Sequence, residues 1–222
     1  MWTLFHHPSA PGSRKVRIAL SELGVPCQIE LVSYWLRQPE FTRLNVAAEV
    51  PVLMLEDEQV VVGDQAICEF LDEVKPDHTL LGPSLEQRSE TRRLLQWFDH
   101  KFSREVTDCI IGEKLVKRLA RTGSPHADTI RVGIANIHYH LDYIGWLVER
   151  RSWLAGNDFS LADCAAAAHI SLVDYLGDVP WTDHDDARTW YMKVKSRPAF
   201  RPLLTETMAG IAPAEHYANL DF

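Results

Sequence analysis

The chain has 222 residues, of which 46% are hydrophobic, so it can bury a substantial core as one large domain or two small ones. Its formal net charge of −8 argues against nucleic acid as the main partner and against general adsorption to anionic membranes. No apolar run approaches the roughly 18 residues that span a bilayer, which predicts no membrane insertion, and early prolines and charges do not fit a signal peptide.

The four cysteines are widely separated and form no paired motif: Cys27, Cys68, Cys109 and Cys164. This spacing predicts reduced, mostly buried thiols in a cytoplasmic protein. It also predicts no structural metal site, because such sites usually draw on closely spaced pairs of ligands.

The first third of the chain alternates short apolar runs with amphipathic segments. The pattern predicts strands at 2–5, 27–32, 51–55 and 59–62, and helices at 14–23, about 39–45 and 65–74. In order, these are a βαβ unit, a further helix and a ββα unit. Such an order predicts a small sheet with helices packed on it.

A composition change marks the next segment. The stretch "KPDHTLLGPS" (75–84) contains two prolines and a glycine, which is typical of a linker. We therefore predict a first domain at 1–77, a linker at 78–85, an all-helical domain at 86–207 and a C-terminal tail at 208–222. Within the second domain, apolar residues three and four apart predict helices at 86–120 and 126–152, another at 160–176 and shorter ones in 186–207.

One helix start is clearly encoded. In Ser160-Leu161-Ala162-Asp163, the serine side chain can accept from the amide of Asp163, while the aspartate can accept from the amide of Ser160. The following residues are apolar almost all round, which predicts a buried helix. A capping role for Asp163 is favoured over a catalytic one.

Three motifs, in this order along the chain, resemble the cytosolic glutathione transferases: "AEVPVL" (48–53), "LAGNDFSLADCAAAA" (154–168) and "KSRPAF" (195–200). The resemblance implies an α/β N-terminal thioredoxin-like domain, an all-α C-terminal domain and a homodimer. It also implies a cis bond before Pro51. In the family, the residue before this proline, here Val50, offers its main-chain N–H and C=O to the cysteinyl part of glutathione.

The family motif around the catalytic serine falls on residues 10–17 of this chain, and the serine position itself is Ala10. That serine donates a hydrogen bond to the glutathione sulfur, and alanine has no donor. Losing a charge-assisted hydrogen bond costs about 1.5–3 kcal/mol. Ser9 and Ser13 are the alternatives for this role, although either residue is also suited to cap the first helix.

A second glutathione-binding stretch is altered as well. The family reads (Glu/Asp)-Ser-x-Ala-Ile where this chain has Gly63-Asp64-Gln65-Ala66-Ile67. Gly63 replaces the acid that holds the ligand's amino group, and Asp64 replaces the serine that holds its carboxylate. The Asp64 carboxylate either repels the ligand carboxylate or turns to the amine. Asp64 is also a good N-cap for the helix that follows.

Three glutathione-handling positions are thus changed while the scaffold motifs survive. We therefore expect a transferase fold with weak or absent transferase activity and no cofactor. In the alternative of an active glutathione S-transferase, glutathione is the co-substrate and small electrophiles are the second substrate.

Two further segments carry residue types that are common in interfaces. The stretch "SYWLRQPEF" (33–41) contributes Tyr34, Trp35, Arg37 and Phe41, with helix packing or a dimer contact as the alternative. The tail "APAEHYANLDF" (212–222) ends in Asp221-Phe222, and the alternative there is a tail that is disordered or folds back on its own domain.

Together with "HHP" near the start, these two segments are similar to a branch of the transferase family that acts in bacterial cell division. The resemblance implies a non-catalytic dimer that binds filaments of the tubulin homologue FtsZ. It also implies that Trp35 and its neighbours contact FtsZ, and that Asp221-Phe222 contacts a second division component.

Overall fold

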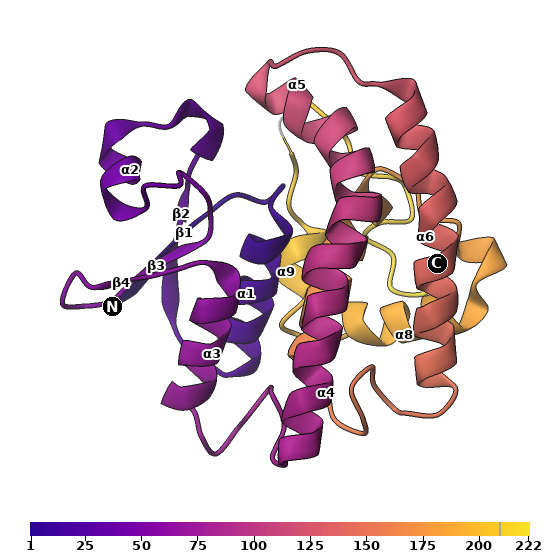
Figure 1. The fold of residues 1–222 in the computed structure, drawn as a ribbon, viewed down its shortest axis with the longest axis horizontal. Helices are drawn as coiled ribbons and strands as arrows, with labels where there is room; N and C mark the ends of the chain where they lie inside the picture. Colours follow the sequence, from indigo (N-terminus) through magenta and orange to yellow (C-terminus); the bar gives the residue numbers. More distant parts are fainter. Residues whose placement is uncertain (209) are drawn as a thin grey trace.

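A four-stranded sheet forms the N-terminal part of the computed structural model, which describes residues 1–208 and 210–222. Its strands are β1 (Trp2–His6), β2 (Cys27–Leu31), β3 (Val52–Met54) and β4 (Val60–Val62), in the spatial order β2-β1-β3-β4. β1 runs parallel to β2 and antiparallel to β3, so Leu4 lies opposite both Ile29 and Leu53. The predicted strands are confirmed, with ends shifted by a residue or two, and β2 is left as an open edge (Figure 1).

Helices cover the two faces of this sheet. α1 (Pro11–Glu22) and α3 (Asp64–Val74) pack against each other, and Leu4 of β1 joins their apolar side chains in the core. Successive side chains of a strand point to opposite faces. Phe5 accordingly contacts Phe41 of α2 (Pro39–Leu44), with the two ring centroids 6.3 Å apart.

The start of α1 corrects one prediction. The N-cap residue is Ala10, with Pro11 in the first turn, and among the residues that the structure describes no side chain caps the helix. Proline suits this position because its missing N–H would have no helical partner anyway. Ser9 and Ser13 therefore do not cap α1; both hydroxyls are engaged by His7 instead.

The C-terminal part is built of helices joined by loops, and it ends in a tail that follows the last helix (Figure 1). A continuous rod comprises α4 (Leu85–Gln96), η2 (Trp97–Val116) and α5 (Lys117–Ala120), which confirms the predicted long helix. The remaining elements are α6 (Ala127–Val148), α7 (Leu161–Tyr175), η3 (Trp181–Asp183), α8 (Asp185–Lys195) and α9 (Arg201–Leu204), with η1 (Tyr34–Leu36) in the N-terminal part. None of the described helices is long and apolar enough to cross a membrane.

The middle of the long rod has wider turns than an α-helix. Along η2 the main-chain hydrogen bonds follow the i→i+5 pattern, as from the N–H of Lys117 to the carbonyl of Gly112. One row of buried side chains recurs at spacings of four to five along this element: Phe98, Phe102, Val106, Ile110 and Leu115. Thr107 and Ile111 are buried beside this row. Wide turns keep this apolar row on one side of the rod and leave another side free to line a cleft.

α7 lies at the centre of the helical part, and all of its residues are buried. The predicted capping box is present at its start: the Ser160 hydroxyl accepts from the amide of Ala162, and Asp163 accepts from the amide of Ser160 at 3.1 Å. Asp163 also accepts from the Leu154 amide and the Trp190 indole, at 3.0 and 2.9 Å. These bonds make Asp163 a structural residue, as predicted.

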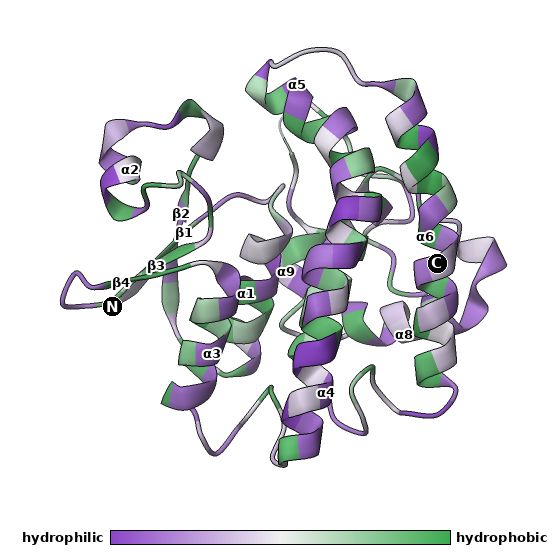
Figure 2. Ribbon diagram, viewed as in Figure 1, coloured by the Kyte–Doolittle hydropathy of each residue, from purple (hydrophilic) through white to green (hydrophobic). Residues whose placement is uncertain are grey.

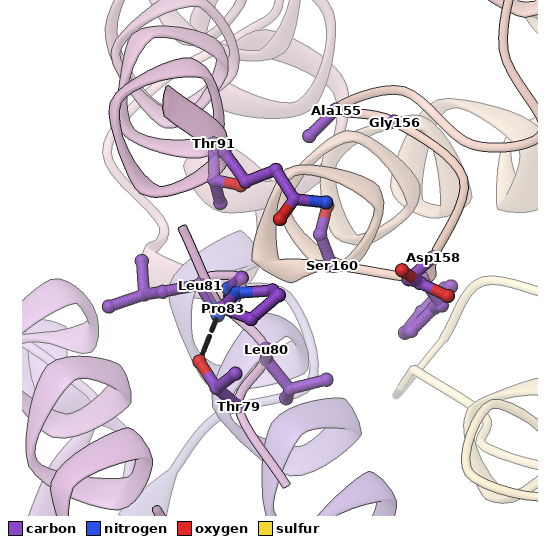
Figure 3. Close-up of a pocket in the computed structure, with 12 residues that line it drawn as sticks. Thr79, Leu80, Leu81, Pro83, Thr91, Ala155, Gly156, Asp158 and Ser160 are labelled. Carbon is purple, nitrogen blue, oxygen red and sulfur yellow. Dashed lines mark hydrogen bonds between the residues drawn. The ribbon is translucent and has the colours of Figure 1, made fainter. Parts of the chain in front are cut away.

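The segment between α3 and α4 is tied down from both sides. Asp72 of α3 accepts hydrogen bonds from the Thr79 hydroxyl and from the amides of Leu80 and Leu81. Figure 3 shows Thr79–Pro83 beside Thr91 of α4 and beside the loop that leads into α7. The hollow there measures about 100 Å³, so we assign it to linker packing. The domain boundaries themselves stay a prediction.

Hydrophobic residues concentrate on the strands and on the inward faces of the helices, while the outer faces are mostly hydrophilic (Figure 2). The two halves of the chain meet where α1 packs against α7. The same core therefore runs from the sheet into the helical part, with Leu4, Val16 and Ile170 all fully or almost fully buried.

Candidate functional site

A cleft of about 440 Å³ opens between the start of α1 and the long rod. The N-terminal part lines it with Ser9, Ala10, Pro11, Tyr34, Glu49 and Val50, and η2 lines it with Ser103, Thr107, Asp108, Ile111, Gly112 and Val116. The cleft brings together Ala10 and Val50, two of the predicted glutathione positions, with the alternative Ser9. It also includes Tyr34, which the sequence had suggested as a partner contact.

The main-chain part of the predicted site is present. The Val50-Pro51 bond is cis, as the resemblance implied. Over residues 1–208 and 210–222, the main chain of Val50 makes no hydrogen bond within the protein. Its N–H and C=O therefore remain available to a ligand in the cleft.

The sulfur-binding part differs from the family pattern. Ala10 places a methyl group where the family has a hydroxyl, and this methyl lines the cleft. The neighbouring Ser9 hydroxyl lies 2.6 Å from Nδ1 of His7, and the Ser9 amide also donates to Nδ1, at 3.2 Å. Burial lowers the pKa of His7 to about 4, so the ring is neutral and Nδ1 is the acceptor. The hydroxyl proton of Ser9 is therefore already donated to His7 and is not free for a ligand sulfur.

Ser13 is not an alternative donor either. Its side chain is fully buried and does not line the cleft, and its hydroxyl accepts from the amide of His7 at 3.3 Å. The Tyr34 hydroxyl, which sequence reasoning did not consider for this role, is the remaining candidate. Burial raises the pKa of Tyr34, and a hydrogen bond with Ser9 acts in the opposite direction.

The region of Gly63 and Asp64 corrects a second prediction. Gly63, not Asp64, is the N-cap of α3, and Asp64 is the first helical residue. Gly63 has φ +90° and ψ 140°, a conformation that side-chain-bearing residues rarely adopt. Glycine therefore adopts without strain a backbone conformation that would strain an acidic residue at this position.

The charge of Asp64 is neutralised inside the protein. Nζ of Lys15, which is only 1% exposed, lies 2.5 Å from carboxylate oxygens of both Asp64 and Asp99. Burial opposes the charge of Lys15, but Asp99 and Asp64 together raise its pKa above the usual range. Of the two predicted alternatives for Asp64, repulsion of a ligand carboxylate or attraction of the ligand amine, the repulsion is offset by this internal cation.

Polar contacts continue from this ion pair to the cleft. Nε2 of His169 lies 3.6 Å from Asp99, and Nδ1 of the same ring lies 2.8 Å from the hydroxyl of Thr107. Thr107 lines the cleft. Gly12 allows the approach of α1 to α3, because a Cβ at this position would lie 3.0 Å from the Cβ of Asp64.

The predicted partner residues of 33–41 separate into two groups. Phe41 is buried against Phe5, so the prediction that its side chain contacts a partner is wrong. Trp35 is half-buried on the His7 ring, with centroids 4.8 Å apart, while Leu36 and Arg37 are exposed. With the exposed Ile29 and Leu31 of the neighbouring edge strand, these residues form what we call the β2–η1 surface: Ile29, Leu31, Trp35, Leu36 and Arg37.

The tail folds back on the helical part. Tyr217 is fully buried, and its hydroxyl accepts from Nη1 of Arg14 at 2.9 Å. The Phe222 ring is half-buried near Trp181 and His216, with Nζ of Lys195 4.2 Å from its centroid. Phe222 is thus held by its own domain, which is the alternative considered above, whereas Asp221 is exposed. Figure 1 places the C-terminus and α2 toward opposite ends of the molecule.

Sequence reasoning missed several residues of the site. Glu49 and Asp108 place two carboxylates at the cleft, and Lys15 and Asp99 form the buried ion pair beneath it. No local pattern signals these roles, because the partners lie far apart in the sequence. Among the described residues, no group of three or more His, Cys, Asp or Glu side chains is arranged to hold a metal ion.

Comparison with known proteins agrees with this architecture. A family model described as "Glutathione S-transferase, N-terminal domain" matches residues 10–74. FtsZ-localized protein A of Caulobacter vibrioides is 49% identical, and the similarity covers 99% of this chain and 98% of that protein.

Solved structures are also similar over the whole chain, including the two that follow. A glutathione S-transferase from Rhodospirillum rubrum F11 shares 50% identity with a TM-score of 0.98, and 100% of each chain is covered. The structure titled "FzlA from C. crescentus" shares 48% identity with a TM-score of 0.95, covering 100% of this chain and 99% of the other.

Proposed function

Because the chain belongs to the glutathione S-transferase superfamily, in the branch that includes FtsZ-localized protein A, we propose that it binds FtsZ filaments. In this proposal it is a cytoplasmic, non-catalytic homodimer that regulates bacterial cell division. The observation that carries the proposal is the near full-length similarity to a protein named for its location with FtsZ.

The chemistry of the cleft supports a non-catalytic role. A transferase must stabilise the glutathione thiolate, because a free thiol has a pKa near 8.5 and is only a few per cent ionised at neutral pH. Ala10 offers no donor, and the Ser9 proton is held by His7. The γ-glutamyl end meets Gly63 and a carboxylate already paired with Lys15.

The β2–η1 surface is the part of the molecule that we assign to the FtsZ contact. It combines a half-buried tryptophan with the exposed apolar side chains of Leu31 and Leu36, which are 64% and 59% exposed. Aromatic and arginine side chains dominate the energy of many interfaces, and this surface includes the exposed Arg37.

The homodimer is part of the same proposal. The outer face of α6 exposes Val132, Tyr139 and Trp146, at 53%, 57% and 49%. A second copy that covers this face would remove these side chains from water. Two FtsZ-binding surfaces in one dimer would then engage neighbouring subunits or filaments, which raises avidity without new contacts. Sedimentation of the wild type and of Trp146→Glu tests the dimer.

Co-sedimentation with GTP-assembled FtsZ tests the filament contact. Leu36→Asp should weaken binding at least about ten-fold, because it places a charge among the apolar side chains of the proposed contact. Leu85→Asp is the matched control, since Leu85 is 82% exposed on α4, outside this surface. The proposal is overturned if the wild type stays in the supernatant, or if the two variants bind equally well.

A specific observation supports the alternative of an active transferase. The main chain of Val50 remains free beside the cis bond, and the Tyr34 hydroxyl lies in the cleft as a possible donor to a thiolate. Turnover of glutathione with a chlorinated nitrobenzene decides between the two functions. Clear turnover that is lost in Tyr34→Phe or Ser9→Ala, without filament binding, would establish the alternative.

A further inference from the structure

We propose that the cleft between α1 and η2 binds a small organic cation, an amine with a compact apolar or aromatic body. The cleft is the one lined by Ala10, Tyr34 and Val50 on one side and by Thr107, Asp108 and Ile111 on the other. This ligand class differs from glutathione, and the proposal is independent of any contact with FtsZ.

The charge of the lining points to a cation. Glu49 lies on the N-terminal side of the cleft and Asp108 on the helical side, whereas the described lining residues include no lysine, arginine or histidine. Within residues 1–208 and 210–222, neither carboxylate forms an ion pair. Acidic groups that line a cleft with low-dielectric walls concentrate cations and repel anions.

Asp108 is the carboxylate that gains most from a cation. Asp108 is exposed, yet desolvation at the cleft wall raises its pKa, and the electrostatic attraction of nearby His169 and a hydrogen bond with Ser103 offset this only in part. A carboxylate that has lost some of its water and has no cationic partner gains a charge-assisted hydrogen bond when an ammonium group arrives.

The rest of the lining suits the body of such a ligand. Ile111, Val116 and Ala10 provide apolar contact, and the Tyr34 ring provides an aromatic face on which a cation or a second ring can pack. The hydroxyls of Ser103 and Thr107 can accept the remaining ammonium protons. A volume of about 440 Å³ is in the range of small-molecule sites.

Glutathione carries two carboxylates and one ammonium group, so the same lining disfavours it. The changes at Ala10 and Gly63 remove glutathione contacts. The carboxylates of Glu49 and Asp108 in addition favour a cationic ligand over an anionic one. The cleft has therefore not simply lost the ability to bind a ligand. Its lining suits a cation, whereas glutathione carries a net negative charge.

Three probes of nearly equal size and different charge test the proposal: tyramine, 4-ethylphenol and 3-(4-hydroxyphenyl)propionate. Each is titrated into the full-length protein by calorimetry at neutral pH. Tyramine should bind with a dissociation constant of about 1 mM or tighter, and at least about ten-fold more tightly than neutral 4-ethylphenol. The carboxylate probe should bind more weakly than both.

Two variants locate the charge that is responsible. Asp108→Asn should weaken tyramine at least about five-fold, and Glu49→Gln should weaken it by a smaller factor. Asp183→Asn is the control: it removes the same unit of charge from an exposed residue that does not line the cleft. Thermal unfolding confirms that all three variants fold.

Several results would overturn the proposal. One is that the three probes bind alike, and another is that tyramine gives no heat at about 10 mM, a range in which even weak sites are detected. A third is that Asp183→Asn weakens tyramine as much as Asp108→Asn, which would reduce the effect to net charge.

Discussion

The ammonium group of Lys15 lies 2.5 Å from a carboxylate oxygen of Asp64, the residue that replaces the family's ligand-binding serine. The same ammonium lies 2.5 Å from Asp99 of the long helical rod. Lys15 therefore joins the first turn of α3 to the helical part through a buried charge. The position that would serve glutathione in a typical family member has here become part of the internal support of the fold.

Removing the shared cation should destabilise the protein strongly. Lys15→Met leaves Asp99 without its partner in a largely buried site, and breaking a buried ion pair on one side costs about 3–5 kcal/mol. Urea unfolding measures the loss. The double variant Lys15→Met/Asp99→Asn should recover part of it, because the more deeply buried carboxylate is then neutral and only Asp64, which is 31% exposed, is left without the cation. A single variant as stable as the wild type would contradict the assigned role of Lys15.

Stability should fall between pH 6.5 and pH 4 because of buried neutral histidines. Burial, followed by the charge of Arg17, lowers the pKa of His6 to about 3; burial lowers that of His7 to about 4. Burial also lowers the pKa of His140 to about 4, despite nearby Glu105. As the pH falls, these histidines are protonated in the unfolded chain first, at about pH 6.5. The free energy of unfolding therefore keeps their full contribution above that pH and decreases toward pH 4.

The variant His140→Gln isolates one contribution to this pH dependence. The glutamine amide can still accept from the Trp97 indole, as Nδ1 of His140 does at 3.1 Å, but it does not titrate. The loss of unfolding free energy between about pH 6.5 and 4.5 should shrink by about a third, since one of three groups is removed. His100→Gln, at an exposed position, should leave the curve unchanged. Identical curves for both variants would contradict the assignment.

Asp163 should be among the most sensitive positions of the helical part. Its carboxylate accepts hydrogen bonds from Ser160, Leu154 and Trp190, and the side chain is fully buried. Asp163→Ala leaves these donors unpaired, so we expect a loss of about 3–5 kcal/mol in urea unfolding followed by Trp fluorescence. Ser160→Ala removes only one cap contact and should cost about 1 kcal/mol. Equal effects of the two variants would show that Asp163 is no more than a cap.

Local patterns were sufficient for much of this fold. The Ser160–Asp163 spacing predicted a capping box, and the apolar periodicity predicted the helices and strands. The wide turns of η2 were not predicted, although the recurrence of Phe98, Phe102 and Val106 every four residues is consistent with them. A spacing of four also fits an α-helix over a short stretch, so the signal becomes distinctive only over several turns.

The site was harder to predict because its energetics depend on residues far apart in the chain. The Ala10 position was identified from a motif, but the engagement of Ser9 by His7 depends on a local turn, and Lys15 bonds to Asp99 across 84 residues. Phe41 is a similar case. From the sequence alone, an aromatic residue in a polar segment fits an interface and a core equally well, and only its tertiary contact with Phe5 shows that it belongs to the core. Tertiary packing decided each of these cases.

Asp221 and Phe222 should have separable effects. Phe222→Ala removes a half-buried ring from the contacts with Trp181 and Lys195, so we expect a loss of about 1–2 kcal/mol and faster amide exchange in the tail. Asp221→Asn changes an exposed side chain and should leave unfolding unaffected. If Asp221→Asn weakens binding of a division component while stability is unchanged, the tail contributes a contact. If only Phe222→Ala has an effect, and through stability alone, the tail is structural.

Restoring the family hydroxyl should stabilise the fold without restoring transferase activity. Ala10 is the N-cap of α1 and has no capping side chain, so Ala10→Ser adds an acceptor for the amides of the first turn. We expect a gain of about 1 kcal/mol, measured by urea unfolding. Ala10→Cys is nearly equal in size but is a weak acceptor, and it should gain less. Glutathione turnover should remain undetectable in Ala10→Ser, because Gly63 and the Lys15-paired Asp64 are unchanged. Turnover gained by this single substitution would show that the missing hydroxyl alone had abolished the reaction.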